Sequence, residues 1–168
     1  MNENRPIWAP WRIEYILSDK TGKCFLCDRE KKSSTEDDYM VIYRGTKAFV
    51  MLNAFPYTSG HVLIAPYRHT SDMSSLEDDL LLEISKLMVI SKEVITDVMK
   101  PNGFNIGYNI GSSAGAGLED HLHLHIVPRW SGDTNFMSVL ANSRVIPQAL
   151  HDTARILKDA FSARLLRE

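Results

Sequence analysis

The sequence predicts an α+β fold, in which antiparallel strands form a sheet and helices lie to one side of it. Two β-rich runs flank the turn Arg44-Gly45-Thr46-Lys47, which is typical of a β-hairpin and therefore of antiparallel pairing. One long helical pattern separates the first three β-rich runs from the last two, instead of helices alternating with every strand. No G-x-G-x-x-G or P-loop lysine pattern is present, so neither of these phosphate-binding motifs offers another fold.

The strand assignments rest on short runs rich in β-branched and aromatic residues. The predicted strands are 39–43, 48–52, 61–65, 104–110 and 121–127. The stretch 53–60 contains Asn, Pro, Thr, Ser and Gly and is predicted to be a loop, while Pro66 ends the third strand. The Gly-rich stretch 111–117 joins the last two strands.

Two helices complete the predicted fold. Ser74-Ser-Leu-Glu77 fits a capping box, in which the Ser hydroxyl and the Glu carboxylate satisfy backbone donors at a helix start. Apolar residues then recur at helical spacing as far as Pro101, which predicts one long amphipathic helix over 74–99. A final helix is predicted after Pro147, with apolar residues at Leu150, Ala154, Leu157, Phe161 and Leu165.

The length of 168 residues fits a single domain with its own core. We divide it into an N-terminal aromatic arm (1–20), a main domain (21–137) and a C-terminal helical extension of the same domain (138–168). The arm combines large aromatic residues with two prolines, which argue against a regular helix through it. We expect its aromatic side chains to pack onto the domain or onto a second subunit.

Charge and cysteine content limit the partners and the compartment. The balance of 19 Lys+Arg against 21 Asp+Glu gives a net charge of −2, which argues against nucleic acid as a partner. No apolar run approaches the roughly 20 residues that span a bilayer, and the N-terminus lacks a signal-peptide pattern. The chain has only two cysteines, too few for a secreted disulfide scaffold, so we expect a cytoplasmic protein without a membrane partner.

Three of the six histidines fall within five residues, at His121, His123 and His125. In a strand alternate side chains share a face, so we expect the three imidazoles to point one way and the intervening apolar residues to enter the core. Successive histidines would lie about 6.6 Å apart, too far for one compact three-histidine metal site. The spacing favours three different tasks: a metal ligand, a reacting group and a phosphate contact.

Imidazole is suited to phosphate chemistry. If one ring nitrogen donates its proton to a backbone carbonyl, the other presents a lone pair near neutral pH and can attack phosphorus, giving a phosphoramidate. A neighbouring histidine and backbone N–H groups would stabilise the charge on phosphate, and Gly111, Gly115 and Gly117 would let the chain approach it closely. From the residues alone, a histidine-lined metal site and solvent-facing strand histidines remain as alternatives.

The two cysteines form the pair Cys24-x-x-Cys27. A thioredoxin-like redox pair would require a βαβ context, which the sequence does not show. Buried inert thiols and a structural zinc site are the other two interpretations. Zinc requires two further ligands, and His69 and His121 are available to complete a closed tetrahedral set.

These motifs together resemble those of the histidine triad (HIT) family. The run HLHLHIVP at 121–128 resembles the family signature, and the resemblance extends over roughly 20–137. The other matching positions, in the family's order, are Asn53, Gly60-His61, Pro66-Tyr-Arg-His69 and Asn109. The segments 8–12 and 128–136 resemble those of a bacterial subgroup, the diadenosine tetraphosphate phosphorylases.

The resemblance implies a five-stranded antiparallel sheet with one long crossing helix, and a homodimer whose sheets join edge to edge. It implies that His123 is the nucleophile that takes up AMP and that His125 contacts the phosphate or the leaving group. It also implies nucleotide contacts and a structural zinc site. The nucleotide-binding positions would be Asn53, His61, Asn109, Gly115, Gly117 and His125, and the zinc ligands Cys24, Cys27, His69 and His121.

The function implied is nucleotidyl transfer on dinucleoside polyphosphates, with inorganic phosphate as acceptor and no organic cofactor. Diadenosine tetraphosphate would give ADP and ATP through a covalent adenylyl-histidine. Hydrolysis of a dinucleoside polyphosphate or of a nucleoside phosphoramidate is the alternative within the same chemistry. A nucleotide-binding module without catalysis is the alternative from another class.

Overall fold

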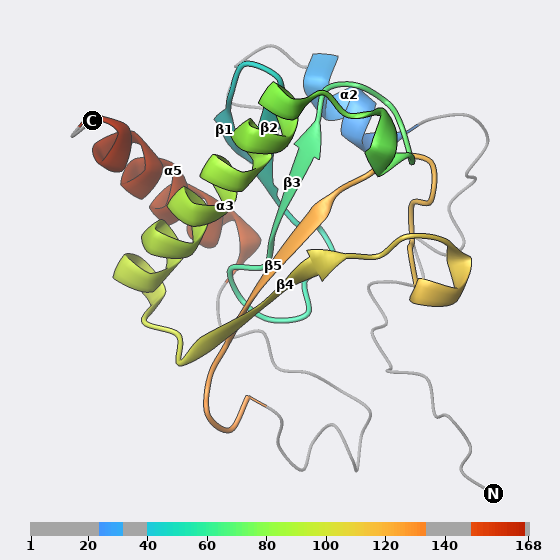
Figure 1. Ribbon diagram of the computed structural model, residues 1–168. Coiled ribbons are helices and arrows are strands. Elements are labelled where there is room, and N and C mark those ends of the chain that lie inside the picture. Colours follow the sequence, from blue (N-terminus) through green and yellow to red (C-terminus); the bar gives the residue numbers. More distant parts are fainter. Residues whose placement is uncertain (1–23, 32–39, 134–148, 167–168) are drawn as a thin grey trace, which may run out of the picture.

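The computed structural model describes residues 24–31, 40–133 and 149–166. The predicted aromatic arm, 1–20, lies outside the described residues. Five strands form one antiparallel sheet in the order β1-β2-β3-β5-β4, which confirms the predicted fold class (Figure 1). The strands are β1 (Val41–Arg44), β2 (Ala48–Leu52), β3 (Val62–Pro66), β4 (Gly103–Tyr108) and β5 (Leu124–Arg129).

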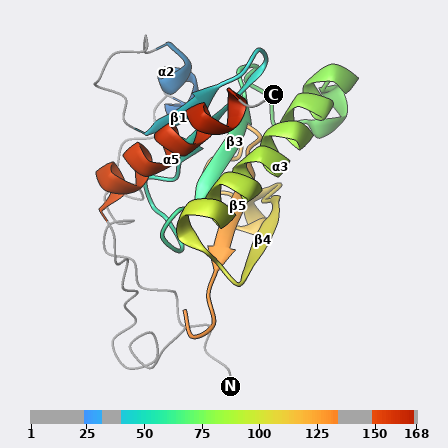
Figure 2. The same cartoon turned by 90° about the vertical axis from the view of Figure 1, so that its left-hand side faces the viewer.

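Two long helices cover one face of this sheet. The helical elements are α2 (Phe25–Lys31), α3 (Asp78–Met99) and α5 (Leu150–Leu165), with 3-10 turns η1 (Met73–Ser75) and η2 (Ser112–Ala114). The helix α3 packs against β2, β3 and β5, and α5 packs against α3 and β1 (Figures 1 and 2). The rings of Tyr43 and Phe161 stack with centroids 5.9 Å apart, which joins β1 to α5.

The core lies around the two central strands. Every residue of β2 and β3 is buried, as expected for strands with both faces covered. On the short helix α2, which was not predicted from the sequence, Leu26 is fully buried and belongs to this core.

None of the helices in the described part of the chain combines the length and apolar character needed to cross a membrane.

The predicted capping box at Ser74 is wrong, and the long helix begins later than expected. Its N-cap is Glu77, which makes no side-chain capping bond. Asp72 instead accepts from the backbone N–H of Ser74 at 2.9 Å and from its hydroxyl at 2.7 Å. Asp72 therefore takes the Ser74 backbone N–H, the donor that the Glu77 carboxylate would accept from in a capping box. Ser74 consequently lies in the 3-10 turn η1 rather than at the start of α3.

Several strand boundaries also differ from the prediction, most clearly those of β4 and β5. The strand β5 begins at Leu124 and continues to Arg129, so the expected strand over 121–127 is wrong at both ends, and β4 ends at Tyr108. Pairing of β5 with β3 ends at Ile126, so beyond that point β5 pairs with β4 alone. The proline at 128 is tolerated there because no donor is required on the β3 side, where Thr58 donates its hydroxyl to the Pro128 carbonyl at 2.8 Å.

Candidate functional site

The stretch that precedes β5 contributes to two neighbouring sites. At the first, four potential metal ligands meet from three separate segments, and their ligand atoms lie within 4.8 Å of one another. The four are Cys24, Cys27, His69 and His121, which we call the metal cluster. Cys24 Sγ is 3.2 Å and Cys27 Sγ 3.5 Å from His121 Nδ1, and Cys27 Sγ is 3.3 Å from His69 Nδ1.

The geometry of the metal cluster fits a four-coordinate metal ion. Zn–S bonds of about 2.3 Å and Zn–N bonds of about 2.0–2.1 Å place tetrahedral ligand atoms roughly 3.3–3.8 Å apart, close to the distances observed. The Nε2–H of His121 donates to the Pro66 carbonyl at 2.8 Å, which leaves the Nδ1 lone pair facing the cysteines. Burial lowers the pKa of His121, which favours the neutral, ligating ring.

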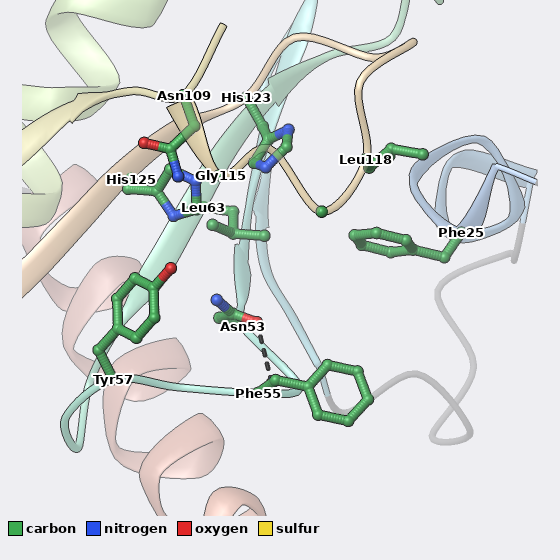
Figure 3. Close-up of a pocket in the computed structure, with 11 residues that line it drawn as sticks. Phe25, Asn53, Phe55, Tyr57, Leu63, Asn109, Gly115, Leu118, His123 and His125 are labelled. Atoms are coloured by element: carbon green, nitrogen blue, oxygen red, sulfur yellow. Dashed lines mark hydrogen bonds between the residues drawn. The ribbon is translucent and has the colours of Figure 1, made fainter. Parts of the chain in front are cut away.

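The second site is a pocket (Figure 3). It adjoins the metal cluster through Phe25, which lines the pocket and follows Cys24 in the chain. The figure shows His123, His125 and Asn109 together on one side, Phe25 near Leu118, and Phe55 and Tyr57 farther down the pocket. Its lining residues are Phe25, Asn53, Phe55, Tyr57, Leu63, Asn109, Gly115, Gly117, Leu118, His123 and His125. Six of these were predicted from the sequence: Asn53, Asn109, Gly115, Gly117, His123 and His125.

His123 is held in one tautomer. Its Nδ1 lies 2.8 Å from the backbone carbonyl of His121, and since a carbonyl only accepts, Nδ1 carries the proton. The other ring nitrogen, Nε2, therefore presents a lone pair. Burial lowers the pKa of His123, a residue that is 7% exposed, so the neutral ring is favoured at pH 7. The geometry provides a neutral nitrogen nucleophile on a residue that lines the pocket.

His61 does not line the pocket but lies wholly buried behind His125. Its Nδ1 accepts from the backbone N–H of Tyr57 at 3.1 Å, and Asn53 Nδ2 lies 3.3 Å from the same atom. The proton of the neutral ring is consequently on Nε2, which is 3.0 Å from His125 Nδ1. His125 thus accepts at Nδ1 and carries its own proton on Nε2.

The Gly-rich turn contributes backbone to the pocket. Gly115 ends η2 with φ of 77°, a left-handed conformation that favours glycine. Its N–H bonds to the Ser112 carbonyl at 3.0 Å. Gly115 therefore brings the backbone to the pocket without a side chain. Its N–H, however, is already hydrogen-bonded within the turn. Gly117 also lines the pocket.

The three triad histidines do not lie in one continuous strand. His121 belongs to the metal cluster, whereas His123 and His125 line the pocket, with ring centroids 4.8 Å apart. The intervening Leu122 and Leu124, and Ile126, are buried in the core as predicted. The strand β5 begins at Leu124, so His121 and His123 precede it and only His125 lies within it.

The apolar part of the pocket was not predicted from the sequence. Phe25, Phe55, Tyr57, Leu63 and Leu118 were not singled out, because isolated apolar residues give no periodic signal that separates a pocket wall from the core. One signal was available for Phe25, which stands between the two cysteines. The Tyr57 ring stacks on His61 with centroids 5.0 Å apart, so it also supports the histidine pair.

The chain is similar to several known proteins. Over 165 residues the chain is 37% identical to the AP-4-A phosphorylase of Mycobacterium tuberculosis strain H37Rv, covering 90% of this chain and 81% of that protein. A Zn-bound histidine triad family protein from Mycobacterium smegmatis has a similar fold, with a TM-score of 0.68 and 23% identity, covering 87% of this chain and 98% of that one.

A histidine triad nucleotide-binding protein described as hypothetical, from Sulfolobus tokodaii, aligns with a TM-score of 0.64 and 26% identity, covering 83% of this chain and 93% of that one. The family model described as HIT domain matches residues 34–132, which include the long helix and all three triad histidines. On this match and the M. tuberculosis relative, the chain belongs to the HIT-domain family.

Proposed function

We propose that this protein transfers an adenylyl group from dinucleoside polyphosphates to inorganic phosphate, through a covalent adenylyl-histidine on His123. The observation that carries the proposal is the His123 ring, whose Nδ1–H is committed to the His121 carbonyl. The similarity to an AP-4-A phosphorylase over 90% of the chain supports the choice of substrate and acceptor.

In the first half-reaction, His123 Nε2 attacks the α-phosphorus of diadenosine tetraphosphate. An N–P bond forms, the bond from phosphorus to the bridging oxygen breaks, and ATP leaves. Charge that develops on the ring is stabilised by the His121 carbonyl, which accepts from Nδ1–H. His125 Nε2–H is suited to donate to the departing oxygen or to a non-bridging phosphate oxygen, because His61 holds the proton on that nitrogen.

In the second half-reaction, an oxygen of inorganic phosphate attacks the same phosphorus and the N–P bond breaks. The products of the full cycle are ADP and ATP, and His123 returns to its neutral state. Water in place of phosphate would release AMP, which is the hydrolytic alternative. Both reactions use the same two histidines, so they differ only in the acceptor that the pocket admits.

The remaining pocket residues fit a nucleoside. Asn53 Oδ1 accepts from the Phe55 N–H at 2.9 Å and retains a second lone pair for a ribose hydroxyl. Phe25, Phe55 and Leu118 provide an apolar wall suited to the face of a base. Asn109 and the turn at Gly115 and Gly117 line the same pocket as the histidines, where the phosphates would lie.

We assign the metal cluster to one structural zinc ion per chain, held by two thiolates and two imidazoles. All four positions are supplied by protein, which is the arrangement of a structural rather than a catalytic zinc site. Metal analysis of the purified protein is expected to give one zinc per chain, and the Cys24→Ser variant to lose it. A wild-type protein purified without any metal would contradict the assignment.

We further propose a homodimer that joins two sheets through β4. This strand is at one end of the described sheet, and its Ile106 is 42% exposed. An exposed strand edge with an apolar side chain favours pairing with another copy. Light scattering should give twice the chain mass for wild type and the single chain mass for Ile106→Lys, whereas a wild-type monomer would contradict the dimer.

Product analysis tests the central proposal. Diadenosine tetraphosphate is incubated with enzyme, with and without inorganic phosphate, and the nucleotides are separated by chromatography. Phosphorolysis gives ADP and ATP only when phosphate is present. AMP with ATP, or ADP alone, in either condition indicates hydrolysis, and unchanged substrate after hours indicates a module that binds without catalysis.

The variant that tests the covalent role of His123 is His123→Gln, compared with wild type. Glutamine occupies a similar volume and can still donate to the His121 carbonyl, but it offers no nucleophilic nitrogen. Turnover should be abolished while the circular dichroism spectrum is retained. Turnover by His123→Gln near the wild-type rate would refute the covalent role of His123.

A further inference from the structure

The metal cluster and the pocket share two short pieces of chain. Phe25, in the pocket wall, stands between the two cysteines of the metal cluster, and His123 follows His121 after one residue. Each of these two segments therefore contains both metal ligands and residues that line the pocket. Contacts that fix the metal ligands also constrain where the pocket residues lie.

The first connection passes through the backbone of His121. Both ring nitrogens of this residue are engaged, Nδ1 in the metal cluster and Nε2 with the Pro66 carbonyl. Just after it, the Leu122 N–H donates to the Thr70 carbonyl at 2.7 Å, next to the ligand His69. These contacts orient the His121 carbonyl, which is the group that accepts Nδ1–H of His123 at 2.8 Å.

The second connection passes through α2. This helix has only seven residues, too few to be stable without tertiary contacts. Cys24 precedes it and Cys27 lies three residues further along, so both thiols reach the same side and meet His69 and His121. The metal cluster thus attaches the start of α2 to the chain before β5, and Phe25 is placed against the pocket.

We propose that metal occupancy of the cluster governs the nucleotide pocket, by fixing the His121 carbonyl that selects the His123 tautomer and by seating Phe25 as part of the apolar wall. The inference rests on the proposed function only in taking AMP as the ligand. His121 and the two cysteines act as positioning residues, since none of them lines the pocket. The metal takes no part in the transfer itself.

The sharpest perturbation is His69→Ala in the full chain. His69 is exposed and does not line the pocket, so the variant removes a metal ligand without altering His121, His123 or Phe25. His69→Cys is the matched control, because three thiolates with one histidine also form a zinc site. Phe25→Leu in the zinc-loaded protein is the second control, which changes the wall and keeps the ligands.

Two measurements are made without turnover. Calorimetry gives the affinity for AMP, and ¹⁵N NMR of the histidine rings gives the tautomer of His123. Zinc-loaded wild type and His69→Cys are expected to bind AMP equally and to show His123 protonated on Nδ1. His69→Ala is expected to bind about 10-fold more weakly, the loss that follows when one large apolar contact is removed, and to show both tautomers.

Phe25→Leu separates the two connections, because it should weaken AMP binding while the His123 tautomer stays fixed. An affinity of His69→Ala equal to that of wild type would overturn the proposal. An unchanged tautomer would overturn the part that concerns His121.

If His69→Ala does not fold, zinc-free wild type, prepared with a chelator and shown by circular dichroism to remain folded, is compared with zinc-loaded wild type. Equal affinity of the two forms for AMP would overturn the proposal, and a weaker affinity of the zinc-free form supports it. A failed phosphorolysis assay leaves the tautomer measurement intact, so the failure of the proposed function and of this inference are distinguishable.

Discussion

At the scale of single residues, the histidines differ through what their second ring nitrogen contacts. His121 donates from Nε2 to a carbonyl and presents Nδ1 to the cysteines, whereas His123 donates from Nδ1 and presents Nε2. His125 receives its tautomer from His61. One residue type can therefore serve as a ligand, a nucleophile or a donor, because a neutral ring has one donor and one acceptor and a fixed partner decides which is which.

The lowered pKa of His123 predicts a pH dependence of stability. Burial keeps the folded pKa below the ordinary value of 6.5, so as the pH falls below 6.5 the unfolded chain binds a proton that the folded chain does not. Stability is fully present above pH 6.5 and is lost as the pH falls towards the folded pKa. Between pH 7.5 and 5.5, wild type should lose about 1 kcal/mol more than His123→Gln in urea unfolding.

The comparison uses the difference between the two proteins, because His121 also has a lowered pKa. That shift comes mainly from burial and is therefore largely retained in His123→Gln. Both proteins are unfolded with the same metal content at each pH. An equal fall in the free energy of unfolding of wild type and of His123→Gln would contradict the lowered pKa of His123.

At the scale of elements, the long helix α3 ends at a residue with an unfavourable backbone conformation. Lys100 has φ of 51° and ψ of 49°, and its N–H bonds to the Thr96 carbonyl. The left-handed conformation costs a residue with a Cβ about 1–2 kcal/mol, and glycine is free of that cost. Lys100→Gly should therefore raise the free energy of unfolding by about 0.5–1 kcal/mol, after the entropy that glycine gains in the unfolded chain.

Lys86→Gly is the matched control for that prediction. Lys86 is exposed within the body of α3, where glycine should destabilise by about 1 kcal/mol. Urea unfolding of the two variants should thus shift in opposite directions. A destabilised Lys100→Gly would mean that the lysine side chain makes a contact that offsets its backbone conformation.

The β1–β2 hairpin depends on a carboxylate from α3. Both oxygens of Glu83 lie 3.1 Å from the backbone N–H of Lys47, in the turn that joins the two strands. Glu83→Ala should cost about 1–2 kcal/mol in urea unfolding, because a charge-assisted bond is lost and a half-buried donor is left. Glu93→Ala, which removes a partly exposed ion pair with Arg164, should cost less than about 1 kcal/mol. Equal costs would argue against a special role for Glu83.

At the scale of the whole molecule, the metal cluster joins segments that are far apart in the sequence. Cys24 and His121 are separated by 97 positions and Cys27 and His69 by 42. A metal that binds only the folded chain stabilises it by mass action. Removal of zinc with a chelator should lower Tm by several degrees, with recovery when zinc is returned, and Cys27→Ser should show no response to chelator. An equal Tm with and without zinc would contradict a structural role.

Much of the fold and part of the site were predictable. Short runs rich in β-branched and aromatic residues predicted all five strands, and apolar residues at helical spacing predicted both long helices, because burial of one helix face imposes a period of 3.6. Boundaries were less predictable. Asp72 accepts from the Ser74 backbone N–H, which the predicted capping box assigned to Glu77. Pro128 fits within β5 because β5 no longer pairs with β3 at that position. Local patterns do not record which neighbour an element will have.

The sequence by itself determined the sheet, the helix that crosses it and the family, because apolar patterning and the triad motif are written in consecutive residues. Only the tertiary structure decided that His121 turns Nδ1 rather than Nε2 to the cysteines and that His61 lies behind His125. It also decided that Phe25 is part of the pocket wall. Tautomers and ligand sets depend on partners tens of residues away, and those partners become neighbours only when the chain is packed.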